Sequence, residues 1–169
     1  MGVERLTDKR QAIELVDLLH RAYAADVRLG IHFGAATITE SDVVMHIQTT
    51  PTFVLRQENR IVATVSVRLP WSSNPGPYAL PHLGWVATHP QFQHHGYAKQ
   101  LIATVINDFI IKILAAPAVS LGTAVEHPWL QRTYQSLGFE PVATVRKFAD
   151  HQTIYLVKTL TTNKFELSR

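Results

Sequence analysis

The sequence contains no cysteine among its 169 residues, which excludes disulfide bonds, thiolate metal ligands and a cysteine nucleophile. Charged residues are also few, at 17% of the chain, and the formal net charge is only +3. Because the basic residues are scattered, we expect no nucleic-acid partner. No apolar run reaches the length of a membrane span, and no secretory signal pattern opens the sequence. We therefore expect no membrane association and a cytoplasmic location.

Apolar residues are plentiful, at 46% of the chain, as is typical of a globular protein rather than a disordered one. The length suits one domain that buries its own core. We therefore predict a single domain over residues 1–169, in which residues 161–169 are loosely ordered. The sequence shows no internal repeat.

The spacing of apolar residues predicts alternating strands and helices. The predicted strands cover residues 3–6, 52–57, 60–69, 78–88, 118–123, 142–146 and 152–160. The predicted helices run from a cap at Thr7 or Asp8 to about residue 25, over 40–48 behind Thr39, from Ala98 to near Leu114, and from Pro128 to a left-handed Gly138. Glu58-Asn59 is a candidate hairpin turn, and the strand–helix–strand order around residue 98 predicts a parallel crossover.

Two loops carry apolar or aromatic residues, and each has two interpretations. The irregular stretch 26–37, which includes Leu29 and Phe33, either folds onto the core or forms a wall of a binding pocket. Trp71, in the turn-rich segment 70–77, either packs as a lid or contacts substrate. Gly84, inside a predicted strand, indicates a bulge or a close approach of another backbone.

The most informative stretch passes from strand to helix over residues 83–106. Pro90 ends the strand, and an amphipathic helix follows from Ala98. Gly96 stands at the helix start, where backbone N–H groups lack intrahelical partners and the helix dipole is positive. A glycine at this point lets a ligand approach the main chain closely, which makes the turn a candidate phosphate site.

Two motifs in this order resemble those of one family. Gln93-x-x-Gly96-x-Ala98 resembles the pyrophosphate loop of the GNAT family of acyl-CoA-dependent N-acetyltransferases, and the preceding Val86-x-x-His89-Pro90 is similar to its usual lead-in. Downstream, Leu130-x-x-Thr133-Tyr134-x-x-x-Gly138-Phe139 resembles the family element Asn-x-x-Ala-x-x-Leu-Tyr-x-x-x-Gly-Phe. His127 stands where the family commonly has Asn, and its imidazole can also donate a hydrogen bond. The resemblance covers roughly residues 52–157.

The resemblance implies an α/β fold of the GNAT acyltransferase type, with a central mixed β-sheet flanked by about four helices. It also implies that acetyl-CoA is the cofactor and that its pyrophosphate lies on the amides between Gln93 and Ala98. The pantetheine arm would pair with main chain around Trp85 to Thr88. The residues implied to bind the coenzyme are Trp85, Val86, Ala87, Thr88, Gln93, His94, His95, Gly96, Tyr97, Ala98, His127 and Tyr134. For at least one of His94 and His95, we favour a solvated loop position.

Acetyl transfer from a thioester to an amine requires a deprotonated amine, a donor for the oxyanion and a proton for the leaving thiolate. A backbone N–H near Val86 is the family-like oxyanion donor, and the Tyr134 phenol can protonate the thiolate. His82, Glu126 and His127 are candidate bases, acting directly or through water. Each of the three also has a plain structural interpretation.

The preferred hypothesis is an enzyme that acetylates a primary amine of a small molecule by direct attack through a tetrahedral intermediate. A peptide or protein acceptor is the first alternative, and a non-catalytic acyl-CoA-binding domain is the second. We expect no metal, because the nine histidines include no His-x-x-x-His or His-x-His pair with a helical carboxylate. Dimers are common in the family, so a homodimer is expected from the resemblance alone.

Overall fold

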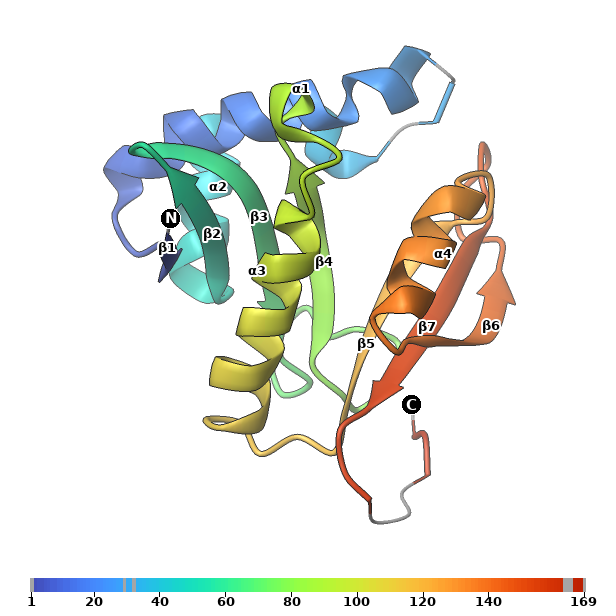
Figure 1. Ribbon diagram of the computed structural model, residues 1–169. Coiled ribbons are helices and arrows are strands. Elements are labelled where there is room, and N and C mark those ends of the chain that lie inside the picture. The colour runs from blue at the N-terminus through green and yellow to red at the C-terminus, as the bar shows by residue number, and fades with distance from the viewer. Residues whose placement is uncertain (1, 29, 32, 163–165, 169) are drawn as a thin grey trace. The chain divides into compact units, whose positions relative to one another are not determined.

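The computed structural model describes residues 2–28, 30–31, 33–162 and 166–168. Within those ranges seven strands form one mixed sheet in the order β1-β2-β3-β4-β5-β7-β6, as Figure 1 shows. The strands are β1 (Gly2–Arg5), β2 (Thr52–Gln57), β3 (Arg60–Arg68), β4 (His82–Thr88), β5 (Ala118–Ala124), β6 (Glu140–Val145) and β7 (Thr153–Thr159). The α-helices are α1 (Ala12–Arg28), α2 (Glu40–Thr49), α3 (Tyr97–Val105) and α4 (Pro128–Ser136). The predicted mixed α/β architecture is confirmed.

The chain divides into two compact units, of which the first contains residues 1–67 and 85–104 and the second contains residues 68–84 and 105–169. The strand β4 belongs to both units, because the division falls between Gly84 and Trp85. Leu29 in the predicted irregular stretch, and residues 163–165 and 169 of the predicted loose tail, lie outside the described ranges. A single domain over residues 1–169 remains a prediction.

In the first unit β1, β2 and β3 form an antiparallel sheet. The β2–β3 hairpin turns through Glu58 and Asn59, whose φ angles of 49° and 64° are both positive. Two successive positive φ values define the turn type whose twist matches that of paired strands. The predicted hairpin is therefore confirmed.

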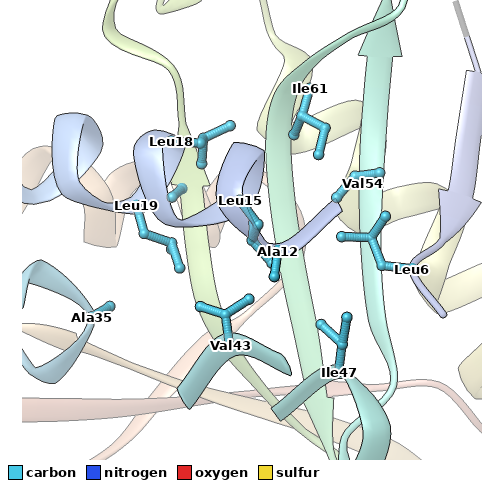
Figure 2. Packing of buried hydrophobic residues seen from close by; sticks show 11 residues of the cluster. Leu6, Ala12, Leu15, Leu18, Leu19, Ala35, Val43, Ile47, Val54 and Ile61 are labelled. Carbon is cyan, nitrogen blue, oxygen red and sulfur yellow. The ribbon is translucent and has the colours of Figure 1, made fainter. Parts of the chain in front are cut away.

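Helices α1 and α2 cover these strands through one apolar cluster (Figure 2). The cluster takes one buried residue from each of β2, β3 and β4, and residues spaced by three or four from the helices, as an amphipathic helix requires. Its buried members are Leu6, Ala12, Leu15, Leu18, Leu19, Ala35, Val43, Ile47, Val54, Ile61 and Ala87. The expected cap of α2 is present: the Thr39 hydroxyl accepts a hydrogen bond from the backbone N–H of Asp42, whose carboxylate accepts from Thr39 in return.

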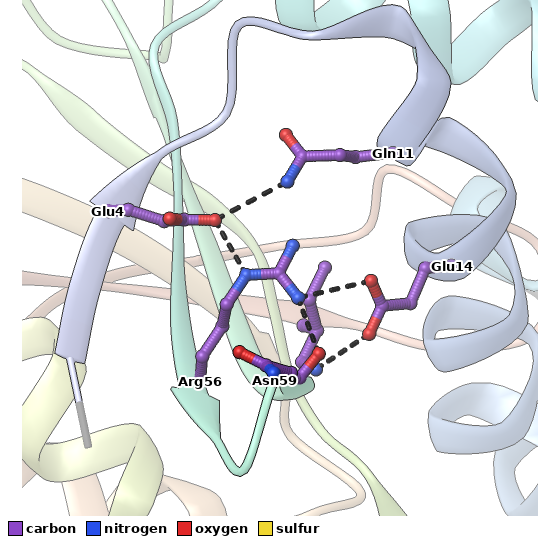
Figure 3. A network of polar contacts seen from close by, with 6 residues as sticks. Glu4, Gln11, Glu14, Arg56 and Asn59 are labelled. Carbon is purple, nitrogen blue, oxygen red and sulfur yellow. Dashed lines mark hydrogen bonds and ion pairs between the residues drawn. The ribbon is translucent and has the colours of Figure 1, made fainter.

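A polar network holds the start of α1 against the β2–β3 hairpin (Figure 3). The Arg56 guanidinium bonds Glu4 at 2.6 Å and Glu14 at 3.2 Å, and its side chain is only 18% exposed. The second carboxylate oxygen of Glu14 accepts a hydrogen bond from the backbone N–H of Ile61 at 2.8 Å. That N–H lies beside a register shift between Leu55 and Arg56, where the regular ladder is interrupted. Glu14 thus satisfies a main-chain donor and orients α1 with the same carboxylate.

In the second unit β4 pairs in parallel with β5, His82 with Ser120 and Leu83 with Leu121, as predicted from the strand–helix–strand order. β5, β7 and β6 then pair antiparallel. β4 begins at His82 rather than at the predicted residue 78. The preceding Pro81 has no N–H to donate to a neighbouring strand, and the N–H of Ala79 donates to the carbonyl oxygen of Ser168.

The end of α4 also follows the prediction. Gly138 has a φ of +95°, and the N–H of Phe139 returns to the carbonyl of Tyr134 at 3.1 Å. The Phe139 ring packs edge-on against the Tyr134 ring at 6.3 Å. By contrast, the helix predicted from Ala98 to Leu114 changes character within its length: α3 ends at Val105, and Ile106–Ile111 continue as a π-helical segment.

The core of the first unit predicts a large difference between two neighbours on α1. Leu15→Ala removes a fully buried side chain, so we expect the free energy of unfolding to fall by about 2–5 kcal/mol. Ile13→Ala, at a side chain that is 63% exposed, should change it by less than about 0.5 kcal/mol. Urea unfolding measures both variants. Equal losses would contradict the packing of α1 described above.

Candidate active site

The main chain of β4 makes an unusual turn at Trp85, where φ is +48°. A bulky residue with positive φ is strained and persists only where its surroundings hold it. Gly84, where the sequence indicated a bulge or a close backbone approach, is not among the glycines with positive φ, and its role stays a prediction. Sequence reasoning missed the position because Trp has no local preference for this conformation.

Two side chains that sequence reasoning did not single out contact β4 at Trp85 and Val86. The Tyr23 hydroxyl, from α1, donates to the carbonyl oxygen of Val86 at 3.1 Å. The imidazole of His46, from α2, stacks on the Trp85 indole with ring centroids 3.6 Å apart and an interplanar angle of 11°. Both residues lie within predicted helices, and no sequence signal links either of them to β4.

The predicted phosphate turn has the local geometry that anion binding needs. It follows a short 3₁₀ turn at Pro90–Phe92 and leads into α3. His94 and Gly96 both have left-handed φ values, 67° and 76°. No atom lies within 4 Å of the position of a Cβ on Gly96, so the main chain there faces open space. The first N–H groups of α3 have no acceptor within the helix and point toward this turn.

The side chains of the turn differ in what they do. Gln93, His94 and His95 are all exposed. His95 Nδ1 lies 2.8 Å from the Gln93 carbonyl oxygen, and because a carbonyl can only accept, Nδ1 carries the hydrogen. The His95 ring stacks on Tyr97, whose hydroxyl donates to Gln57 at 3.0 Å. His95 and Tyr97 therefore brace the turn.

On α4, Tyr134 is buried, and burial raises the pKa of its phenol to about 12. The hydroxyl therefore keeps its proton at neutral pH and can act as a donor. His127 is the residue before the first turn of α4, and its buried ring lies 4.7 Å from the Trp129 ring. His127 and Tyr134 are seven residues apart, which places them on the same face of the helix.

His82 is buried at the start of β4, where its Nδ1 lies 2.8 Å from the Ser120 hydroxyl and its ring meets the edge of Tyr155. Burial, with the positive charges of Arg68 and Lys147, lowers the pKa of His82 to about 3. The imidazole is therefore neutral and weakly basic. Glu126, two residues beyond β5, is exposed and accepts the backbone N–H of Gln152 at 3.2 Å.

The structure distributes the predicted residues between the two units. The first unit contains the candidate coenzyme contacts Trp85, Val86, Ala87, Thr88, Gln93, His94, His95, Gly96, Tyr97 and Ala98. The second contains Tyr134, His127, His82 and Glu126. The first group follows one continuous segment of β4, turn and α3, as the strand-turn-helix pattern predicted.

The model of the Acetyltransferase (GNAT) family matches residues 17–139, which include the turn, α3 and α4. The chain belongs to the GNAT family. Among characterised relatives of this GNAT chain, the S-(2-succino)cysteine N-acetyltransferase of Bacillus subtilis is 35% identical over 156 residues, which cover 92% of the chain and 94% of the relative. The S-alkylcysteine N-acetyltransferase of the same organism is 30% identical over 137 residues, or 80% of the chain and 77% of the relative.

Solved structures agree on the fold. The ribosomal-protein-alanine N-acetyltransferase of Brucella melitensis superposes with a TM-score of 0.74 at 15% identity, over 95% of this GNAT chain and all of the other. YncA of Salmonella typhimurium, solved with its cofactor acetyl-CoA, gives a TM-score of 0.74 at 16% identity, over 98% and 97% of the two chains. Family and relatives together identify an N-acetyltransferase rather than a non-catalytic binding domain.

Among the residues that the structure describes, none of the helices has the length and apolar character that a membrane span requires. No group of three or more histidine, aspartate or glutamate side chains in that part of the chain is arranged to hold a metal ion.

The geometry of the turn predicts that Gly96→Glu lowers the affinity for acetyl-CoA about 100-fold or more. The new side chain would occupy the open space over the main-chain amides and would place a carboxylate against the phosphates. Isothermal titration calorimetry measures the affinity, with circular dichroism to verify folding.

Gly30→Glu is the matched control for this variant. Gly30 has a similar φ of +79° and an equally open Cβ position, but lies after α1. It should bind acetyl-CoA as the unchanged protein does. Normal affinity in the Gly96 variant would refute the phosphate site.

Proposed function

We propose that this GNAT enzyme transfers the acetyl group of acetyl-CoA to the α-amine of an S-substituted cysteine. One observation carries the proposal: the chain matches an S-(2-succino)cysteine N-acetyltransferase along nearly its whole length at 35% identity. The second relative, an S-alkylcysteine N-acetyltransferase, acts on the same kind of molecule with a different sulfur substituent. The shared part of the two substrates is the cysteine backbone with its free amine. A homodimer and a cytoplasmic location remain predictions.

For the coenzyme, we propose that the pyrophosphate lies on the backbone amides from Gln93 to Ala98. The left-handed Gly96 and the start of α3 support this position. The pantetheine arm would use main-chain groups of Trp85 to Thr88. Because Tyr23 already occupies the carbonyl of Val86, the arm would pair with the other main-chain groups of that stretch. His127 would contact the coenzyme where the family commonly has Asn.

The α-amine of an S-substituted cysteine needs less help from a general base than a lysine side chain does. The α-amine of an amino acid is less basic than an alkylamine such as lysine, whose pKa is about 10. A larger fraction of the α-amine than of a lysine side chain is therefore unprotonated at pH 7. A single weak base, or a carboxylate acting through water, is enough for such an acceptor.

Among the candidate bases, we propose Glu126. Its carboxylate is exposed, whereas the His82 imidazole is buried and too weakly basic to hold a proton near neutral pH. We propose a structural role for His82, bonded to Ser120 across the β4–β5 pair. Its bond also fixes the register at which the two parallel strands meet.

The proposed reaction is direct transfer. The amine nitrogen forms a bond to the thioester carbonyl carbon, and the resulting oxyanion accepts the backbone N–H of Val86. When the carbon–sulfur bond breaks, the Tyr134 phenol gives its proton to the thiolate. The proton lost by the amine passes through Glu126 and solvent and returns the phenol to its neutral form. With a pKa of about 12, the phenol is protonated before each turnover, as a proton donor must be.

A panel of acceptors tests the substrate class. We expect kcat/KM for S-(2-succino)cysteine or an S-alkylcysteine to exceed that for free lysine, spermidine or an alanine-terminated peptide by about tenfold or more. Release of coenzyme A thiol and mass spectrometry of the product measure the reaction. The N-acetylated form of the best acceptor, which has no free amine, is the blank. A preference for spermidine or the peptide would contradict the proposal.

Tyr134→Phe tests the general acid. We expect kcat to fall about 100-fold with little change in the affinity for acetyl-CoA, because the ring is kept and only the donor is lost. Tyr155→Phe, at another buried tyrosine of the same unit, should leave kcat unchanged.

In the unchanged enzyme we expect no loss of rate between about pH 7 and pH 10, since the phenol stays protonated below its pKa of about 12. Steady-state rates across this range measure it. A Tyr134→Phe rate equal to that of the unchanged enzyme would remove Tyr134 from the mechanism.

A further inference from the structure

The positive φ of Trp85 needs a physical explanation. A bulky residue in this conformation costs roughly 1–3 kcal/mol and persists only where its surroundings hold it. Trp85 is not a glycine, which tolerates a positive φ because it has no Cβ. It is also not a small polar residue, whose side chain could form a local hydrogen bond with the backbone. The conformation must therefore be stabilised by contacts from other elements of the first unit.

The first contact comes from α1. The Tyr23 hydroxyl donates to the Val86 carbonyl at 3.1 Å, and the Tyr23 ring lies against the Phe33 ring at 5.5 Å. α1 is itself fixed at its start by the Glu14 bond to the Ile61 N–H and by the buried Leu15. The hydroxyl thus reaches the β4 carbonyl from an anchored helix.

The second contact comes from α2, and the direction of its hydrogen bonds can be worked out. The Thr52 hydroxyl donates its single hydrogen to the Thr50 carbonyl, so in its 3.1 Å contact with Ser66 it accepts. The Ser66 hydroxyl therefore donates to Thr52 and accepts from His46 Nε2 at 2.8 Å. Nε2 consequently carries a hydrogen, and the buried Ser66 and Thr52 determine the orientation of the imidazole that stacks on Trp85.

The two contacts lie on either side of one peptide group. His46 holds the side chain of Trp85, and Tyr23 holds the carbonyl of Val86. The peptide that carries the Val86 N–H connects these two residues, so both of its ends are restrained. We propose that Tyr23 and His46 are positioning residues for acetyl transfer, which aim the Val86 N–H at the oxyanion. The inference rests on the proposed use of that N–H in the reaction.

This role predicts a specific kinetic effect. Donors that stabilise an oxyanion act mainly in the transition state, so misaiming one lowers the chemical rate more than it weakens ground-state binding. We expect Tyr23→Phe, which removes only the hydroxyl, to lower the single-turnover rate of acetyl transfer about fivefold to tenfold. The acetyl-CoA dissociation constant and the acceptor KM should change less than about twofold.

Paired variants of His46 separate stacking from hydrogen bonding. His46→Phe keeps a flat ring over Trp85 and should retain more of the rate than His46→Gln, which can still bond Ser66 but cannot stack. His20→Gln is the matched control, because His20 is an exposed histidine of α1 whose Nε2 lies within hydrogen-bond distance of the Ile38 carbonyl oxygen. It should keep the full rate.

The readout is the single-turnover rate per coenzyme-binding site, counted by titration with acetyl-CoA, using the best acceptor of the panel. The inference is supported if the variants bind acetyl-CoA as the unchanged enzyme does but react more slowly, and if His46→Phe reacts faster than His46→Gln. Unchanged rates in Tyr23→Phe and both His46 variants would overturn it. The inference would also be overturned if the loss of rate disappears when the rate is expressed per coenzyme-binding site, because such a loss would indicate a purely structural role.

The same experiment keeps the two proposals apart. If S-substituted cysteines are poor acceptors of the unchanged enzyme but another amine is acetylated, the substrate class fails while the positioning role is still measured with that amine. If S-substituted cysteines are good acceptors and the variants keep their rates, only the positioning role fails.

Discussion

The left-handed backbone of Trp85 is the constraint on which the first unit depends. A bulky residue held at positive φ stores strain, and the neighbouring elements contact it there. One hydroxyl from α1 and one imidazole from α2 restrain the two ends of one peptide. The Glu14 carboxylate contributes by fixing the helix that carries Tyr23.

Burial has opposite consequences for two titratable groups of the second unit. It raises the pKa of Tyr134, so the phenol stays a proton donor, and lowers that of His82, so the imidazole stays neutral. Burial thus keeps the phenol protonated and the imidazole uncharged near neutral pH. The exposed Glu126 is the proposed base, and the modest basicity of an α-amine makes a carboxylate sufficient.

Features that depend on neighbours in sequence could be predicted well. The Glu58-Asn59 turn, the Thr39 cap, the left-handed Gly138 and the Gly96 turn before α3 all follow from local backbone preferences. Features that depend on distant contacts could not. The left-handed residue of β4 is Trp85, although a bulky residue prefers a negative φ, so tertiary contacts outweigh the local preference there.

The order of strands and helices, the helix caps and the phosphate turn were therefore determined by the sequence itself, since each depends on backbone conformations and hydrogen bonds within a few residues. Tyr23 and Val86 are 63 residues apart, and no periodicity or motif connects them. Only the tertiary structure decided that this pair, and the stacked His46 and Trp85, would meet at one peptide. The physical reason is that packing of α1 and α2 on the sheet, rather than any local preference, brings these side chains to β4.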